Sequence, residues 1–153
     1  EGEVLNYQGI PSFSPEIFKE LINLDPMKSK QLEKGIDQLT DEGVAQLFTQ
    51  PQLGNRKIVG TVGDLQYEVI QYRLEHEYGA KCTYENFPVH KACWVKPDDT
   101  KSDEFKEFKR IKQKFLAHDK YGQLVFLADS EFTIQMTQSK FPTVKLFFTS
   151  EFD

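Results

Sequence analysis

The chain has 153 residues, of which 39% are hydrophobic and 28% are charged, and its formal net charge at pH 7 is −5. A chain of this length forms one domain of ordinary size or two small packed halves, with enough core to need no metal or disulfide. The acidic balance argues against a surface covered with phosphate contacts, and the sequence has no run of 18 apolar residues that could span a membrane.

The N-terminal residues, 1–15, are expected to precede the main fold. The first nine, EGEVLNYQG, have neither the basic start nor the apolar core of a signal peptide, and they include no initiator methionine. We therefore expect the chain to be a piece of a longer protein, with GIPSFSP (9–15) as a linker.

The next segment, EIFKELINL (16–24), fits two secondary structures. The Ser-Pro pair before it and the spacing of its apolar residues slightly favour a helix, whereas the partial alternation of Phe18, Ile22 and Leu24 fits a strand. If it is a strand, residues 17–87 have the order β-α-β-β-α-β, which is the split-βαβ order of the ferredoxin-like fold.

The remaining elements up to residue 87 have clearer boundaries. Asp25 is a helix N-cap followed by a first-turn proline, and Gly79 is a C-terminal glycine. Gly35 lies beside an apolar stripe and would let its helix approach a sheet closely. The predicted elements are helix 27–39, a hairpin of strands 43–50 and 56–62, helix 65–78 and strand 80–87.

Residues 88–153 repeat the alternation of strand and helix less clearly. The apolar spacing predicts strands 89–96, 124–128 and 144–150, with helix 103–116 and a weaker helix 130–141 between them. We therefore predict an α+β fold: a ferredoxin-like plait (antiparallel sheet with helices on one face) plus a C-terminal β-α-β-α-β extension packed on it. No repeat of fixed period is evident.

The two glycines in GTVGDLQ (60–66) raise the question of a phosphate-binding loop. A P-loop requires the pattern G-x-x-x-x-G-K-[ST], which the chain lacks. The carboxylate of Asp64 would also repel a phosphate at this helix end. The segment instead predicts a tight strand-to-helix turn capped by Asp64, with no nucleotide site.

The two cysteines, Cys82 and Cys93, have His90 between them. A zinc site is possible in principle, but the spacing lacks a C-x-x-C pair and supplies at most three nearby ligands. Buried free thiols in a reducing cytosol are the favoured interpretation. No serine stands in a G-x-S-x-G motif, and no set of residues predicts a catalytic site.

Arg73 falls between two apolar edges of the predicted helix 65–78, one formed by Leu65, Val69 and Tyr72. It could be an anchor for a partner, but pairing with Glu77, four residues on, is favoured.

The predicted helix 103–116 carries the strongest positive charge. Between Lys101 and Lys120 there are seven basic and four acidic residues, a local balance of +3 in an acidic chain. Such asymmetry can steer a protein to RNA phosphates. The charge pattern alone slightly favours an ordinary solvated helix face. The candidate RNA or ribosome contacts lie on the side away from the phenylalanines and are Lys106, Lys109, Arg110 and Lys114.

Three long stretches carry a family resemblance: FSPEIFKELINLDPMKSKQLEKGIDQLTDEGVAQLF, IVGTVGDLQYEVIQYRLEHEYGAKCTYE and YGQLVFLADSEFTIQMTQSKFPTVKLFFTSE. In this order they resemble the C-terminal part of the bacterial peptide chain release factor 3 family, translational GTPases that act with the stop-codon-reading release factors. The resemblance runs from Gly9 to the end of the chain. GTVGDLQYEV is also similar to a helix-opening segment of the third domain of elongation factor G.

The resemblance implies a domain organisation. It makes 16–24 a strand rather than a helix. It also makes residues 1–15 the end of a preceding β-barrel domain and linker, residues 16–87 a ferredoxin-like half, and residues 88–153 a C-terminal α/β half. The GTPase domain would lie upstream. This fragment would then be no enzyme and hold no cofactor or metal, whereas the intact cytoplasmic protein would use GTP and magnesium.

The resemblance also implies a function. The fragment would dock the intact GTPase on the ribosome, through ribosomal RNA and proteins, and help to recycle class I release factors. Its own GTPase and β-barrel domains would be further partners, and no membrane would be involved. The alternative is a free-standing ferredoxin-like interaction or ligand-sensing module that dimerises through its sheet.

Overall fold

The structure is a computed structural model that describes residues 14–149. The expected end of a β-barrel domain and most of the expected linker lie outside these residues. The described part is mixed α/β, with four α-helices and a single antiparallel sheet of eight strands.

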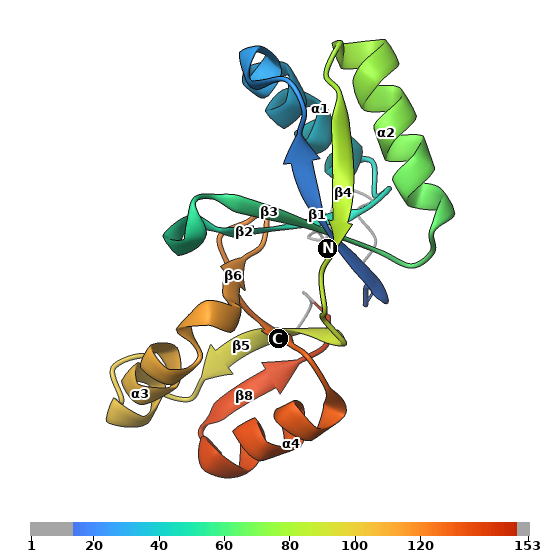
Figure 1. Ribbon diagram of the computed structural model, residues 1–153. Coiled ribbons are helices and arrows are strands. Elements are labelled where there is room, and N and C mark those ends of the chain that lie inside the picture. The colour runs from blue at the N-terminus through green and yellow to red at the C-terminus, as the bar shows by residue number, and fades with distance from the viewer. Residues whose placement is uncertain (1–13, 150–153) are drawn as a thin grey trace, which may run out of the picture.

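The first half, residues 14–87, begins with a strand, as the family resemblance implied and the local helix signal did not. Its elements follow the order β-α-β-β-α-β (Figure 1). They are β1 (Ile17–Asn23), α1 (Ser29–Asp41), β2 (Gln46–Gln50), β3 (Arg56–Thr61), α2 (Leu65–Tyr78) and β4 (Cys82–Asn86). Short 3-10 helices, Pro26–Lys28 and Pro51–Leu53, precede α1 and follow β2.

The second half, residues 88–149, corrects the predicted β-α-β-α-β extension. Its elements are β5 (Lys91–Pro97), α3 (Asp103–Ile111), β6 (Leu116–His118), β7 (Leu124–Ala128), α4 (Glu131–Lys140) and β8 (Val144–Phe147). The short strand β6 was not predicted, because the steps of Ile111 and Phe115 continue the helical spacing. In the structure α3 ends at Ile111, a 3-10 turn follows at Gln113–Phe115, and the chain then pairs with β2 and β7.

The element order of the second half therefore repeats that of the first, although no periodic sequence repeat shows it. The strands lie in the order β4-β1-β3-β2-β6-β7-β5-β8, so that each half contributes four neighbouring strands. The halves meet at the pair β2 and β6, where Thr49 lies opposite His118.

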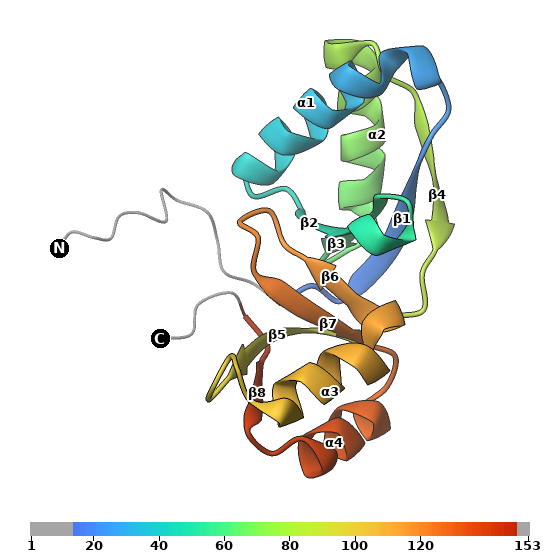
Figure 2. The same ribbon diagram turned by 90° about the vertical axis from the view of Figure 1, so that its left-hand side faces the viewer.

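The helices lie at the two ends of the molecule and the strands lie between them. Figure 2 shows α1 and α2 at one end, and α3 and α4 at the other. The inward faces of the two half-sheets share a buried cluster that draws on both halves: Phe18, Phe48, Ile58, Ala92, Trp94, Ala117, Val125 and Leu127. The rings of Phe48 and Trp94 meet edge to face, with centroids 5.7 Å apart.

Polar side chains cross the junction between the halves. Gln50 on β2 is fully buried, and its Nε2 donates to the backbone oxygens of Lys114 (3.2 Å) and Leu116 (3.1 Å) in the second half. Lys120, in the turn between β6 and β7, reaches the C-terminal end of α1. There it pairs with Asp41 and with Asp37 (3.1 Å), and donates to the backbone oxygen of Asp37 at 2.8 Å. Cationic groups are favoured at this end of a helix.

Gly35 brings two helices together rather than a helix and a sheet, which corrects the prediction. A Cβ built on Gly35 of α1 would lie 2.5 Å from Leu74 Cδ2 and 2.9 Å from Tyr78 Cδ2, both on α2. Leu74 is itself fully buried, so it has little room to move. The close contact of α1 and α2 therefore depends on the missing side chain.

The predicted helix ends are mostly confirmed. Asp25 Oδ1 accepts from the backbone N of Met27 (3.1 Å) and caps the 3-10 helix Pro26–Lys28, after which α1 begins without a side-chain cap. Gly79 ends α2 in the left-handed region with φ of 67°. The exception is Asp64, which precedes α2 but makes no capping hydrogen bond with its side chain. Its carboxylate lies 3.7 Å from Lys19 Nζ instead.

The two cysteines belong to different cores. Cys82 packs in the cluster beneath α1 and α2, and Cys93 packs in the cluster beneath α3 and α4. Both are free thiols, and no group of three or more potential metal ligands occurs among residues 14–149. Burial raises the pKa of Cys82 to about 11 and that of Cys93 to about 12. The structure thus favours the free-thiol interpretation over a shared zinc site.

The contact at Gly35 generates a stability prediction. Overpacking a core costs about 1–3 kcal/mol, while alanine gains about 1 kcal/mol over glycine in a helix. We expect Gly35→Ala to lower the free energy of unfolding by about 1 kcal/mol in a urea titration. Lys34→Ala, at an exposed neighbouring position, is the control and should change it by less than about 0.5 kcal/mol. A Gly35→Ala protein as stable as the wild type would contradict the close contact.

The buried thiols predict a loss of stability in alkali. Above about pH 9 a cysteine ionises in the unfolded chain, whereas Cys93 stays protonated in the folded chain because its pKa is raised. The unfolded state then binds fewer protons, so the free energy of unfolding falls by about 1.4 kcal/mol per pH unit for each such thiol.

Cys93→Ala should therefore make this alkaline slope shallower by about 1.4 kcal/mol per pH unit between about pH 9 and 10.5, measured by urea titrations at several pH values. Val125→Ala, which alters another buried side chain without a titratable group, should lower stability at every pH and leave the slope unchanged. Equal slopes in Cys93→Ala and the wild type would show that the thiol ionises freely in the fold.

Candidate functional site

The way α3 packs on the sheet decides which of its faces is exposed, and so where the predicted basic residues lie. The helix begins at Ser102, whose Oγ accepts from the backbone N of Phe105 at 3.1 Å. Phe105 and Phe108 are buried, and Phe108 meets Phe126 of β7 and Phe141 edge to face at 5.9 and 5.5 Å. These contacts turn the opposite face of α3 to solvent.

The four candidate residues all lie on the exposed side of this region. Lys106, Lys109 and Arg110 are exposed residues of α3, and Lys114 is exposed on the 3-10 turn that follows it. The structure thus places the predicted set along one helix and its continuation. Because the helix is shorter than predicted, Lys114 belongs to a different element from the other three.

The four residues differ in how much of their charge is available. Arg110 makes a bidentate contact with Glu107, with Nε and Nη2 at 3.0 and 2.6 Å from the two carboxylate oxygens. This hydrogen bonding holds the pKa of Glu107 below its usual range. Lys109 Nζ lies 4.6 Å from the centroid of the Phe105 ring, a contact that keeps its charge. Within residues 14–149, Lys106 and Lys114 have no ion pair.

Sequence reasoning left out two further lysines near this face. Lys112 is half-buried, with Nζ 5.6 Å from the centroid of the Phe126 ring. Lys140, at the end of α4, is close enough to Glu107 to lower the pKa of that carboxyl by its charge. Lys112 stood in the same basic run. Lys140 is 28 residues beyond Lys112, and no sequence pattern connects it with α3.

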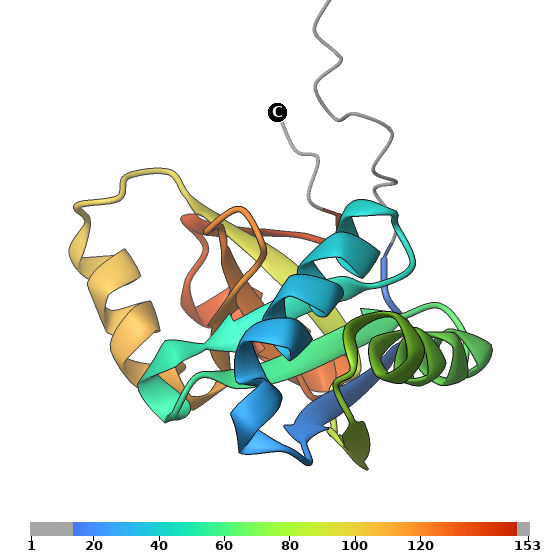
Figure 3. The same ribbon diagram turned by 90° about the horizontal axis from the view of Figure 1, so that it is seen from above.

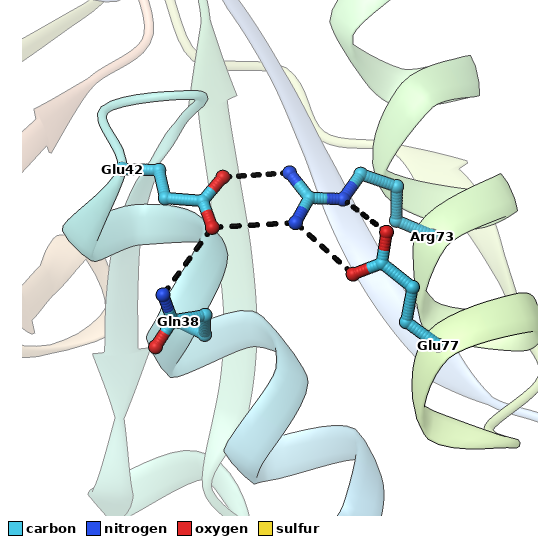
Figure 4. A network of polar contacts seen from close by, with 4 residues as sticks. All are labelled: Gln38, Glu42, Arg73 and Glu77. Carbon is cyan, nitrogen blue, oxygen red and sulfur yellow. Dashed lines mark hydrogen bonds and ion pairs between the residues drawn. The ribbon is translucent and has the colours of Figure 1, made fainter.

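Arg73 is a partly exposed residue whose guanidinium is paired with two acids of the same chain. Its guanidinium contacts Glu77 on α2 at 2.9 and 3.0 Å, and Glu42 just after α1 at 2.6 and 3.2 Å (Figure 4). Gln38 donates to the same Glu42 carboxylate at 3.2 Å. Hydrogen bonds from Arg73 and Gln38 lower the pKa of Glu42. The predicted Glu77 pair is therefore confirmed, and a second acid joins α1 to α2.

The segment around Gly60 and Gly63 does not fit a nucleotide phosphate. A Cβ at Gly60 would lie 2.8 Å from Pro15 Cβ, so this glycine allows β3 to pack against Pro15. The oxygen of Gly63 accepts from Thr61 Oγ1 at 2.8 Å, and the exposed carboxylate of Asp64 stands at the start of α2. The turn is thus organised by contacts within the fold.

The exposed cations on α3, a helix fixed to the sheet by its phenylalanines, can attract anions. No helix in the described part of the chain is both long and apolar enough to cross a membrane.

Comparison with known protein families identifies the chain. Residues 7–138 match the family model described as class II release factor RF3, C-terminal domain. The match covers most of the chain and agrees with the resemblance seen in the sequence. The chain therefore belongs to the family of the class II release factor RF3, as its C-terminal domain.

Proposed function

We propose that this chain is a ribosome-docking domain that positions a translation-termination GTPase and so promotes the recycling of class I release factors. The family gives it a release-factor-associated role in translation, as the non-catalytic C-terminal part of a GTPase-family protein. The observation that supports docking is the exposed face of α3, where Lys106 and Lys114 are free of ion pairs within residues 14–149.

In this proposal, GTP is bound and hydrolysed by another part of the intact protein. GTP and magnesium would be held by a GTPase domain upstream, as the family resemblance implies. In this domain Pro15 packs against Gly60, and Thr61 Oγ1 donates to the oxygen of Gly63 in the turn that follows. The domain described by the structure would convert the nucleotide state of that GTPase into a placement on the ribosome. A cytoplasmic location follows from this role.

We propose that the α3 face contacts ribosomal RNA. Lysines attract phosphates without regard to sequence. Lys106 and Lys114 are exposed, and Lys109 is exposed with its Nζ over the edge of the core at the Phe105 ring, where it keeps its charge. Arg110 contributes less than the sequence predicted, because Glu107 already occupies its guanidinium. Lys140 extends the face onto α4.

We infer that both halves of the fold are ferredoxin-like plaits. Each has the element order β-α-β-β-α-β, and each contributes four neighbouring antiparallel strands with two helices on one face. The proposed domain organisation is then 16–87 and 88–153, and β2 and β6 join the two halves edge to edge.

The α3 proposal predicts weaker ribosome binding on charge reversal. In the intact factor, Lys106→Glu with Lys114→Glu should reduce the affinity for the ribosome. The slope of log affinity against log salt should become shallower by about one for each phosphate that the altered side chains no longer neutralise. Binding measured by co-sedimentation at several salt concentrations would give both quantities.

The matched control makes the same change of net charge elsewhere. Lys30→Glu with Lys34→Glu alters two exposed lysines of α1, in the other half of the molecule. It should leave the salt slope unchanged if the contact is local to α3. Unchanged affinity and slope in the α3 variant, or equal decreases in both variants, would exclude α3 as the RNA contact.

A further inference from the structure

Helix α2 exposes a stripe of apolar side chains to solvent. Leu65, Val69 and Tyr72 are spaced by four and three residues and are 68%, 38% and 63% exposed. Val62, in the loop before the helix, is also exposed. The ring of His76 lies against that of Tyr72 at a tilt of 32°, with centroids 4.1 Å apart. We call Val62, Leu65, Val69 and Tyr72 the α2 stripe.

The stripe is not part of the core, because α2 already buries its opposite side. Tyr67, Ile70 and Leu74 are buried against the sheet and α1. A surface helix normally carries polar residues on its outer face. Single exposed apolar residues need no explanation, but a row with helical spacing is the pattern of anchors by which helices bind partners.

Contacts on the other sides of α2 hold the stripe in one position. The hydroxyl oxygen of Tyr67 lies 2.9 Å from the backbone oxygen of Ile17, and Gln71 donates to the backbone oxygen of Cys82 at 2.7 Å. The Arg73 network ties the α1 side of the helix to Glu42. A surface held in this way loses little conformational entropy when a partner binds.

Charge around the stripe restricts the kind of partner. Glu68 and Glu75 lie one turn before and after Gln71, on the side facing β4, and neither has an ion pair within residues 14–149. On the α1 side, Arg73 is neutralised by Glu42 and Glu77. Lys19 offsets only Asp64, at 3.7 Å. The stripe is thus apolar with an acidic margin.

We propose that the α2 stripe is a docking surface for a polypeptide segment that carries apolar side chains beside lysine or arginine. Nucleic acid does not fit, because Glu68 and Glu75 would repel its phosphates. A second copy of the chain does not fit either, because two α2 helices packed face to face would bring their acidic margins together. Tyr72, large and rigidly placed, is the expected main anchor.

This surface is separate from the basic face of α3. Figure 3 shows α2 and α3 on opposite sides of the molecule, as do Figures 1 and 2. The proposal therefore does not depend on RNA binding by α3, and each can fail without the other.

The test is a selection of peptides displayed on phage, of about twelve random residues, against the full chain. A parallel selection uses Leu65→Ser with Tyr72→Ser. The matched control is Phe132→Ser with Met136→Ser, because Phe132 on α4 is 70% exposed and Met136 is also exposed. Circular dichroism verifies that each variant is folded, as expected for changes at exposed positions.

We expect the selection to enrich peptides with apolar residues next to lysine or arginine. The affinity of these peptides for the Leu65→Ser, Tyr72→Ser variant should fall at least about ten-fold. A ten-fold change corresponds to about 1.4 kcal/mol, which is the size expected for the loss of one interface anchor. The affinity for the α4 control should be unchanged. Exchanging both acids, as Glu68→Lys with Glu75→Lys, should shift the enriched peptides from basic to acidic residues.

Several results would overturn the proposal. These are failure to enrich any peptide, enrichment that the α4 control reduces equally, or a charge preference that ignores Glu68 and Glu75. A dimer in analytical ultracentrifugation that the α2 variant abolishes would assign the stripe to a second copy instead. Binding of single-stranded RNA that the same variant abolishes would assign it to nucleic acid.

Discussion

The contact between the two inward sheet faces is the constraint on which the rest of the structure depends. Each half has helices on one face of its four strands. The other face is apolar, and in an isolated half it would be exposed to solvent. Phe18 and Phe48 from the first half meet Trp94 and Val125 from the second, and these side chains are buried. Neither half could hide this surface alone, and burial of each large side chain contributes about 1.5–3 kcal/mol. The two helix layers are therefore forced to opposite ends.

Polar groups at the edge of this contact fix the orientation of the halves. Gln50 is buried with its amide on the backbone of Lys114 and Leu116, so a slip of the halves would leave polar groups without partners. Burial lowers the pKa of Lys120, but its hydrogen bonds with Asp41 and Asp37 outweigh this and raise it. The ammonium of Lys120 is thus charged where it meets the end of α1. The apolar contact and these polar contacts therefore favour the same relative orientation of the two halves.

Helices and turns could be predicted from the sequence better than the strands whose conformation depends on pairing with distant residues. Periodicity located all four helices, and Gly79 marked the end of α2, because these signals act within a few residues. It missed β6, since three strand residues that follow a helical spacing carry no pattern of their own and form a strand only by pairing with β2 and β7. The strand β1 became clear only from the family resemblance, because its neighbours in the sheet decide its conformation.

The candidate site shows the same division. Helical geometry predicts that the lysines of α3 are exposed. It also allows Arg110 to pair with Glu107, because residues three apart are neighbours on a helix. By contrast, Glu42 binds Arg73 across 31 residues and Lys140 approaches α3 from another helix, and only the tertiary fold brings them together. The charge pattern alone could not show which basic side chains of α3 are paired, and the structure assigns Glu107 to Arg110.

The two halves also differ in net charge: the first half is acidic and the second is basic. Residues 14–87 contain eight basic and twelve acidic residues, whereas residues 88–149 contain eleven basic and eight acidic residues. Charges of opposite sign in the two halves would suit the two proposed partners, RNA at α3 and a basic polypeptide at α2, because neither partner would repel the other. The β2–β6 pair and the shared core join the two ends, so the proposed contacts at α3 and α2 would be made by one connected fold.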